Sequence, residues 1–117
     1  MMESPQSVLP LTESTFYTLL SLAMGSKHGY AVLKHVEALS EGSVVLSTST
    51  LYSALLRLQD QGLIERVDQA AGAAANPGLP RKAYALTERG RRTLEAEMTR
   101  LRRQVRAGQR LGGEFAG

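Results

Sequence analysis

Residues 47–64 have the sequence STSTLYSALLRLQDQGLI, the most informative segment of the chain. Its first four residues carry hydroxyl groups, which can accept hydrogen bonds from the free backbone N–H groups in the first turn of a helix. The sequence predicts an amphipathic helix that is capped by Ser47 or Ser49 and that ends at Gly62. Its predicted inner stripe is apolar: Leu51, Ala54, Leu55 and Leu58. Its predicted outer side is polar: Thr50, Ser53, Arg57 and Asp60.

Two short segments after this helix alternate apolar and polar residues, as half-buried strands do. They cover residues 63–67 and 82–86. The stretch between them, residues 68–81, is rich in Ala and Gly and contains Asn-Pro-Gly, which predicts a long loop without order at its tip. A helix followed by such a hairpin is typical of a winged helix-turn-helix. The expected fold class is therefore mainly α with a small β-hairpin.

Two more helices are predicted upstream of residue 47. The first starts after Thr12, a suitable N-cap, and its apolar residues follow helical spacing until it ends near Gly25. The second starts near His28 and ends before Gly42, which is suited to a C-cap. Residues 44–46 are β-prone and form either a small strand or an extended connection.

A last helix is predicted to start at Thr87, its N-cap. Its apolar residues are spaced by four, three and four, as in about two heptads of a coiled coil: Leu94, Met98, Leu101 and Val105. Its other faces are almost entirely charged. Because three other helices already supply the core, this narrow seam predicts a dimer contact. The alternative is that the seam packs against the first helix of the same chain.

The composition fits one globular domain without disulfides. The chain has 117 residues, of which 43% are hydrophobic, and it contains no Cys and no Trp. The lack of Cys excludes disulfides and thiolate metal sites. Residues 1–6 lack the pattern of a signal peptide, and no apolar run approaches the roughly 20 residues that cross a bilayer. We therefore expect a soluble cytoplasmic protein that makes no membrane contact.

The positive charge is concentrated toward the end of the sequence. Residues 1–79 carry 4 Lys/Arg and 7 Asp/Glu, a net charge of −3, whereas residues 80–117 carry 10 Lys/Arg and 4 Asp/Glu, a net charge of +6. Such a basic region fits contact with a nucleic acid or another anionic surface. A solvated, arginine-rich helix is the alternative interpretation of the same composition.

The sequence carries no pattern of catalytic or metal-binding residues. His28 and His35 are seven residues apart, without Cys or carboxylates at ligand spacing. It contains neither a phosphate-binding glycine loop nor a nucleophile in a context that pairs it with a base. We expect no metal, no cofactor and no enzymatic activity.

Several short motifs occur in the order and spacing of a known family. The most specific are His28-Gly29-Tyr30, Thr50-Leu51-Tyr52 and Arg81-Lys82-Ala83-Tyr84, and the matching motifs together span roughly residues 12–106. On these residues the chain resembles the PadR family of bacterial transcriptional regulators, and in particular its short subfamily. Ser49 and Ser53 stand where the family usually has Gly and Pro, which predicts a different DNA sequence preference. The loop over residues 68–81 also looks longer than is typical.

The resemblance implies a winged helix-turn-helix domain over residues 11–86, a dimerisation helix over residues 87–107, and flexible ends at residues 1–10 and 108–117. It also implies a sequence-specific DNA-binding regulator, a repressor that acts as a homodimer on a pseudo-palindromic operator. The expected DNA contacts are Ser47, Thr48, Ser49, Thr50, Tyr52, Ser53, Arg57, Arg81 and Lys82. The expected dimer contacts are Phe16, Leu19, Leu94, Met98, Leu101 and Val105. A small hydrophobic effector at the dimer interface would contact Phe16, Tyr17 and Met98, whereas in the alternative interpretation these three residues belong to the core.

Simpler roles stay open for these residues. In the alternative interpretation one serine only caps its helix, Tyr52 packs against a neighbour, and the arginines and the lysine are solvated. Tyr30 and Lys34 contact phosphate in one interpretation, whereas Tyr30 belongs to the core in the other. For the whole chain, the alternative is a winged-helix module that binds a regulatory protein partner instead of DNA.

Overall fold

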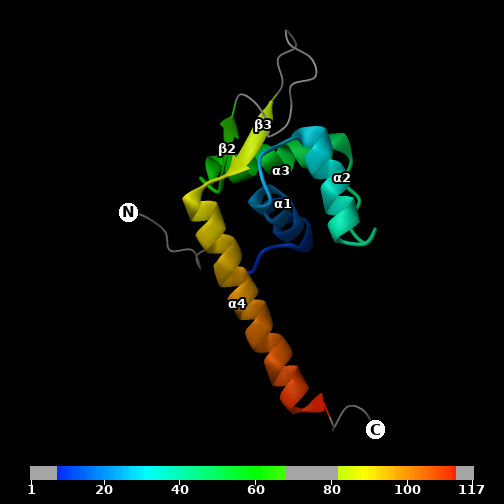
Figure 1. Ribbon diagram of the computed structural model, residues 1–117, viewed down its shortest axis with the longest axis vertical. Helices are drawn as coiled ribbons and strands as arrows, with labels where there is room; N and C mark the ends of the chain where they lie inside the picture. The colour runs from blue at the N-terminus through cyan, green and yellow to red at the C-terminus, as the bar shows by residue number, and fades with distance from the viewer. Residues whose placement is uncertain (1–7, 68–81, 113–117) are drawn as a thin grey trace.

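Four helices and three short strands make up the part of the chain that the computed structural model describes, residues 8–67 and 82–112. In chain order they are α1 (Glu13–Ala23), β1 (Lys27–His28), α2 (Gly29–Leu39), α3 (Thr48–Asp60), β2 (Ile64–Val67), β3 (Ala83–Leu86) and α4 (Glu88–Arg110) (Figure 1). This arrangement confirms the predicted fold class, a mainly helical winged helix-turn-helix with a small antiparallel sheet. The sequence predicts that the loop between β2 and β3 lacks order at its tip. That prediction concerns residues 68–81, which lie outside the described ranges.

The sheet has one strand more than the sequence predicts. β2 and β3 form the expected antiparallel hairpin, in which Ile64 pairs with Leu86 and Val67 with Ala83. β1 adds to the free edge of β3, so the strand order is β1-β3-β2. The two residues of β1 are too few to show the alternation by which strands are predicted. Residues 44–46, the other β-prone segment, form an extended connection and no strand.

Hydroxyl side chains cap the N-termini of three of the four helices in the described residues. Thr15 N–H donates to the Thr12 side chain at the start of α1, as predicted. At the start of α3, the N–H of Thr50 donates to the Ser47 hydroxyl at 3.1 Å, so Ser47 and not Ser49 is the N-cap. The predicted Thr87 cap of α4 is likewise confirmed. Each cap satisfies a backbone donor that would otherwise lack a partner within its helix.

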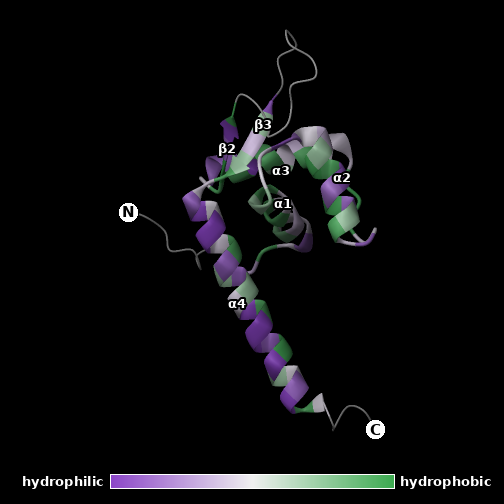
Figure 2. Ribbon diagram, viewed as in Figure 1, coloured by the Kyte–Doolittle hydropathy of each residue, from purple (hydrophilic) through white to green (hydrophobic). Residues whose placement is uncertain are grey.

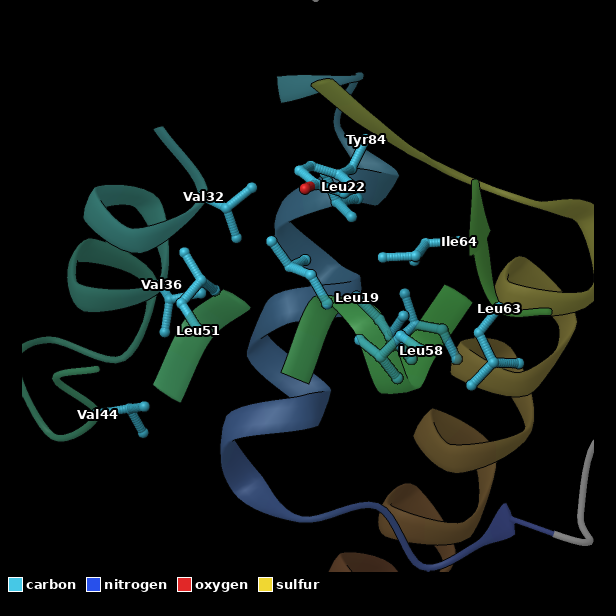
Figure 3. Close-up of a cluster of buried hydrophobic side chains, with 12 residues drawn as sticks. Leu19, Leu22, Val32, Val36, Val44, Leu51, Leu58, Leu63, Ile64 and Tyr84 are labelled. Atoms are coloured by element: carbon cyan, nitrogen blue, oxygen red, sulfur yellow. The ribbon is translucent and has the colours of Figure 1, made fainter. Parts of the chain in front are cut away.

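Apolar side chains, mostly Leu and Val, from all four described helices and the sheet form the core (Figure 3). The buried apolar cluster consists of Leu19, Leu22, Val32, Val36, Val44, Leu51, Leu55, Leu58, Leu63, Ile64, Tyr84 and Leu94. α3 contributes three of its four predicted inner residues to this cluster, and the fourth, Ala54, is partly buried. The apolar periodicity of α3 therefore predicted correctly which side of the helix faces the core.

The first turn of α4 packs directly on the turn that precedes β2. A Cβ atom added to Gly90 would overlap the backbone carbonyl oxygen of Leu63, so only glycine permits this approach. The same turn of α4 is held by two further bonds. The Thr87 hydroxyl donates to the carbonyl oxygen of Gly62 at 2.7 Å, and the Thr87 N–H donates to that of Leu63 at 3.1 Å. These contacts fix where α4 leaves the winged domain.

A buried carboxylate joins α4 to the segment before α1. Glu97 is only 1% exposed, and its Oε2 accepts from the Leu11 N–H at 2.9 Å and from Arg100 Nη2 at 2.9 Å. The hydrogen bond from Arg100 lowers the pKa of Glu97, burial opposes it, and the Leu11 N–H lowers the pKa further. The net pKa of Glu97 lies below its ordinary value, so the charged form is favoured in the folded chain.

α4 extends beyond its predicted end at residue 107 and reaches Arg110. The sequence predicts a flexible tail from Gly108 onward, but a glycine in the last turn breaks no helical hydrogen bond and costs a helix only about 1 kcal/mol. The second half of α4 projects away from the rest of the domain and is mostly hydrophilic (Figures 1 and 2). None of the helices within the described ranges combines the length and apolar character needed to cross a membrane.

We predict that Gly90→Ala lowers the free energy of unfolding by about 1–3 kcal/mol, because the new methyl group must displace backbone. Urea denaturation at one fixed protein concentration measures the change. Gly108→Ala is the matched control, since a Cβ there meets no atom within 4 Å, and it should raise stability by about 0.5–1 kcal/mol. A Gly90→Ala variant as stable as the Gly108→Ala variant would contradict the close approach of α4 to Leu63.

Glu97 should make stability depend on pH in the acid range. Because its pKa is lower in the folded than in the unfolded chain, its stabilising effect is complete above the unfolded value of about 4.3. The effect is lost as the pH falls through the folded pKa. We expect Glu97→Gln to flatten the acid side of the stability curve and to cost about 1–3 kcal/mol at neutral pH. Glu95 is an exposed neighbour on α4, and Glu95→Gln should leave the acid side of the stability curve and the stability at neutral pH unchanged. Identical acid slopes for the wild type and Glu97→Gln would rule out this role.

Candidate nucleic-acid interface

The buried leucines of α3 determine which of its side chains face outward. Leu51, Leu55 and Leu58 are at most 1% exposed and fix the rotation of the helix about its axis. Residues at spacings of three and four share a helix face, so the side opposite the leucines follows from the sequence numbering. Its members are all exposed: Ser49, Ser53, Leu56 and Asp60. The sequence predicts Ser49 and Ser53 as contact residues, but its pattern does not single out Leu56, which is 60% exposed.

The first turn of α3 presents free hydrogen-bonding groups. The N–H groups of Thr50 and Leu51 are bonded to Ser47, through its hydroxyl and its carbonyl oxygen respectively. Those of Thr48 and Ser49 precede the first such bond and are left without a partner inside the helix. The Thr48 hydroxyl makes no hydrogen bond within the described residues, and the Ser49 hydroxyl lies 3.4 Å from that of Ser47. This turn can therefore bind an anion or polar groups.

Tyr52 connects α3 to the start of α2. Its hydroxyl end lies so close to Gly29 that a Cβ atom on Gly29 would overlap it. Tyr52 as a whole is 41% exposed. Tyr52 therefore packs against Gly29, as the alternative interpretation expects. Its exposed part remains available to a partner.

The exposed side of α2 carries an aromatic ring and a cation. Tyr30 is 69% exposed, so the alternative that placed it in the core is wrong. Lys34 Nζ lies 5.8 Å from the centroid of the Tyr30 ring, a cation–π distance. Lys82, just before β3, is also exposed. Arg81, the other predicted wing contact, lies outside the described residues.

Arg57 lies at the edge of the outward face. Its Nη2 atom is 3.4 Å from the Thr15 hydroxyl of α1, at the side of a groove of about 420 Å³ between α1 and α3. The groove is lined mainly by hydroxyl side chains, among them Thr12, Ser14, Thr50 and Ser53. Arg57 is exposed, as predicted, but it faces α1 more than the centre of the outward face.

The residues of the predicted dimer seam differ in exposure along α4. Leu94 is only 4% exposed and belongs to the core of its own chain, and Met98 packs against that core. Leu101 is half-buried and Val105 is 58% exposed, so the seam becomes accessible toward the end of α4. Leu19 has no exposed surface at all, and its assignment to a dimer interface is wrong because the core of its own chain covers it completely.

The aromatic residues predicted to contact an effector are partly buried on α1. Phe16 and Tyr17 meet edge to face, with their ring centroids 5.5 Å apart, and both pack against the core. Met98 of α4 also packs against the core. An effector bound between these residues stays a prediction.

The histidines serve local structure in the described residues. His35 Nδ1 lies 2.9 Å from the Ser21 hydroxyl, and burial, followed by the charge of Lys27, lowers the pKa of His35. His28 precedes α2 as its N-cap residue without a side-chain bond to the helix. Nowhere in residues 8–67 and 82–112 do three His, Asp or Glu side chains gather as a metal-binding group.

Comparison with known proteins places this geometry among transcriptional regulators. The model of the family described as transcriptional regulator PadR-like matches residues 18–96. Among curated protein sequences, none matches the chain.

Solved structures share the fold at low sequence identity. A PadR family transcription regulator from Clostridium difficile R20291 has 23% identity and a TM-score of 0.69, with 91% of this chain and 100% of that chain covered. A PadR-like transcriptional regulator from Bacillus cereus has 24% identity and a TM-score of 0.66, with 83% and 88% covered. Bacillus subtilis PadR in complex with operator DNA has 23% identity and a TM-score of 0.61, with 72% and 46% covered.

Proposed function

Because the chain belongs to the PadR-like family of transcriptional regulators, we propose that it binds double-stranded DNA as a homodimer and represses transcription in the cytoplasm. The observation that carries this proposal is the outward side of α3, where hydroxyl groups and free backbone N–H groups are exposed together. A single α-helix fits the major groove of B-DNA. The operator DNA in the Bacillus subtilis PadR structure supports DNA as the partner.

Contacts to phosphates and contacts to base edges have different roles in the proposed DNA binding. The free N–H groups at the start of α3, together with Lys34, Lys82 and Arg81, are suited to phosphates, which supply most of the affinity. The hydroxyl groups of Thr48 and Ser49 are suited to base edges in the major groove, which supply sequence preference. Such binding falls steeply as the salt concentration rises.

The accessible end of the α4 seam supports a homodimer. Val105 is 58% exposed on a helix that projects from the domain, and the half-buried Leu101 precedes it by one turn. Pairing these residues with those of a second copy would remove apolar surface from water. A two-fold axis would then place two α3 helices about one turn of DNA, ~34 Å, apart, and the operator would be a pseudo-palindrome.

DNA binding is tested by fluorescence anisotropy on duplexes enriched from a random-sequence pool, and on random duplexes, at low and physiological salt. We expect Thr48→Ala and Ser49→Ala to change the preference between the two sets. Lys82→Ala should weaken binding to both sets similarly and reduce the salt slope by about 1. Arg106→Ala, which removes a cation from the projecting part of α4, is the charge-matched control and should leave the sequence preference unchanged.

Equal losses on enriched and random DNA for both hydroxyl variants would contradict the assignment of base contacts to Thr48 and Ser49. If no duplex is enriched and the protein instead forms a stable complex with another protein, the protein-binding alternative replaces the DNA-binding proposal.

The dimer is tested by Val105→Asp, since Val105 is exposed and its replacement should leave the monomer folded. A carboxylate placed in an apolar contact is costly, so we expect a monomer by size-exclusion chromatography with light scattering, and at least tenfold weaker operator binding. Thr99→Asp adds the same charge on another side of α4 and should remain a dimer. A dimer that tolerates Val105→Asp unchanged would place the interface elsewhere.

A further inference from the structure

An exposed leucine lies in the middle of the outward side of α3. Leu56 is 60% exposed and follows Ser49 by seven residues and Ser53 by three, so the three side chains share one face. The core does not need Leu56, because Leu55 and Leu58 already occupy the inner stripe. Leu56 is therefore an apolar group within the surface that the proposed function assigns to DNA.

The neighbours of Leu56 define how far this surface extends. One turn before it lies Tyr52, which is 41% exposed and held against Gly29. One turn after it lies Asp60, an exposed carboxylate that DNA phosphates would repel. The segment that can approach DNA closely thus begins at the N-cap Ser47 and ends near Leu56 on α3.

The chemical groups on the base edges of the major groove limit what Leu56 can contact favourably. Base edges there carry hydrogen-bond donors and acceptors, and the one apolar group among them is the C5 methyl group of thymine. An apolar side chain set against the polar edge of a G·C pair would strip water from that edge and offer no hydrogen bond in return. Against a thymine methyl group, the same side chain buries apolar surface on both partners.

We propose that Leu56 determines specificity by contacting the C5 methyl group of a thymine in each half-site; this inference rests on the proposed DNA-binding function. Seven residues of helix separate Leu56 from Ser49, which amounts to about 10 Å of rise. Successive base pairs are ~3.4 Å apart, so the thymine lies within about three base pairs of the base that Ser49 meets. A homodimer repeats the contact in the other half-site.

Uracil, which is thymine without the methyl group, tests this contact. Duplexes enriched by the wild type from a random pool are remade with deoxyuridine at each thymine in turn, and affinities are measured for the wild type and for Leu56→Ala. For the wild type, we expect the loss of one methyl group to weaken binding about fourfold at one position per half-site, as ~0.8 kcal/mol implies. For Leu56→Ala, thymine and uracil at that position should bind within a factor of about 1.5, the remainder left by so small a side chain.

Leu111→Ala is the matched control, because it truncates another exposed leucine at the end of α4. It should keep the full fourfold preference for thymine, even if it alters overall affinity. If Leu56→Ala keeps the thymine preference of the wild type at every position, or if the enriched duplexes show no thymine preference, the contact is overturned while DNA binding stands. If the wild type enriches no duplex at all, the proposed function itself fails, and the thymine contact fails with it.

Discussion

The burial of Leu51, Leu55 and Leu58 is the constraint on which the rest of this molecule depends. Each side chain belongs to the buried apolar cluster, and truncating one to Ala would cost about 2–5 kcal/mol. Together they hold α3 at one rotation, and that rotation decides which side chains meet a partner. The surface proposed to bind DNA is therefore a consequence of core packing: the hydroxyl groups of Ser49 and Ser53 face outward because the leucines face inward.

Two contacts between distant parts of the chain set the direction of α4, and hence the position of the proposed dimer contact. The missing side chain of Gly90 lets the first turn of α4 lie on the carbonyl group of Leu63. Two turns later, the buried carboxylate of Glu97 holds the backbone N–H of Leu11. Because its first half is held in this way, the second half of α4 extends away from the domain and its apolar seam stays accessible. The geometry of a two-fold DNA complex would depend on both contacts.

The sequence predicted those features whose causes are local. The inner stripe of α3 and the caps at Thr12 and Thr87 were predicted correctly, because periodicity and capping act within a few residues. β1 was missed since two residues carry no pattern, and it exists only because the edge of β3 is free to pair with it. Leu19 was assigned to the wrong surface because residues spaced along one helix face do not reveal which neighbour covers them. Leu56 was overlooked since it adjoins the leucines of the inner stripe.

We propose that the outward side of α3, fixed by its buried leucines, is the surface that contacts DNA. Backbone amide NMR shifts of the full chain, recorded while a duplex enriched from a random pool is added, test this claim most directly. We expect the largest shift changes on residues 47–57, with further changes at Lys34 and Lys82. Changes confined to the seam of α4, with α3 unaffected at saturating DNA, would contradict it.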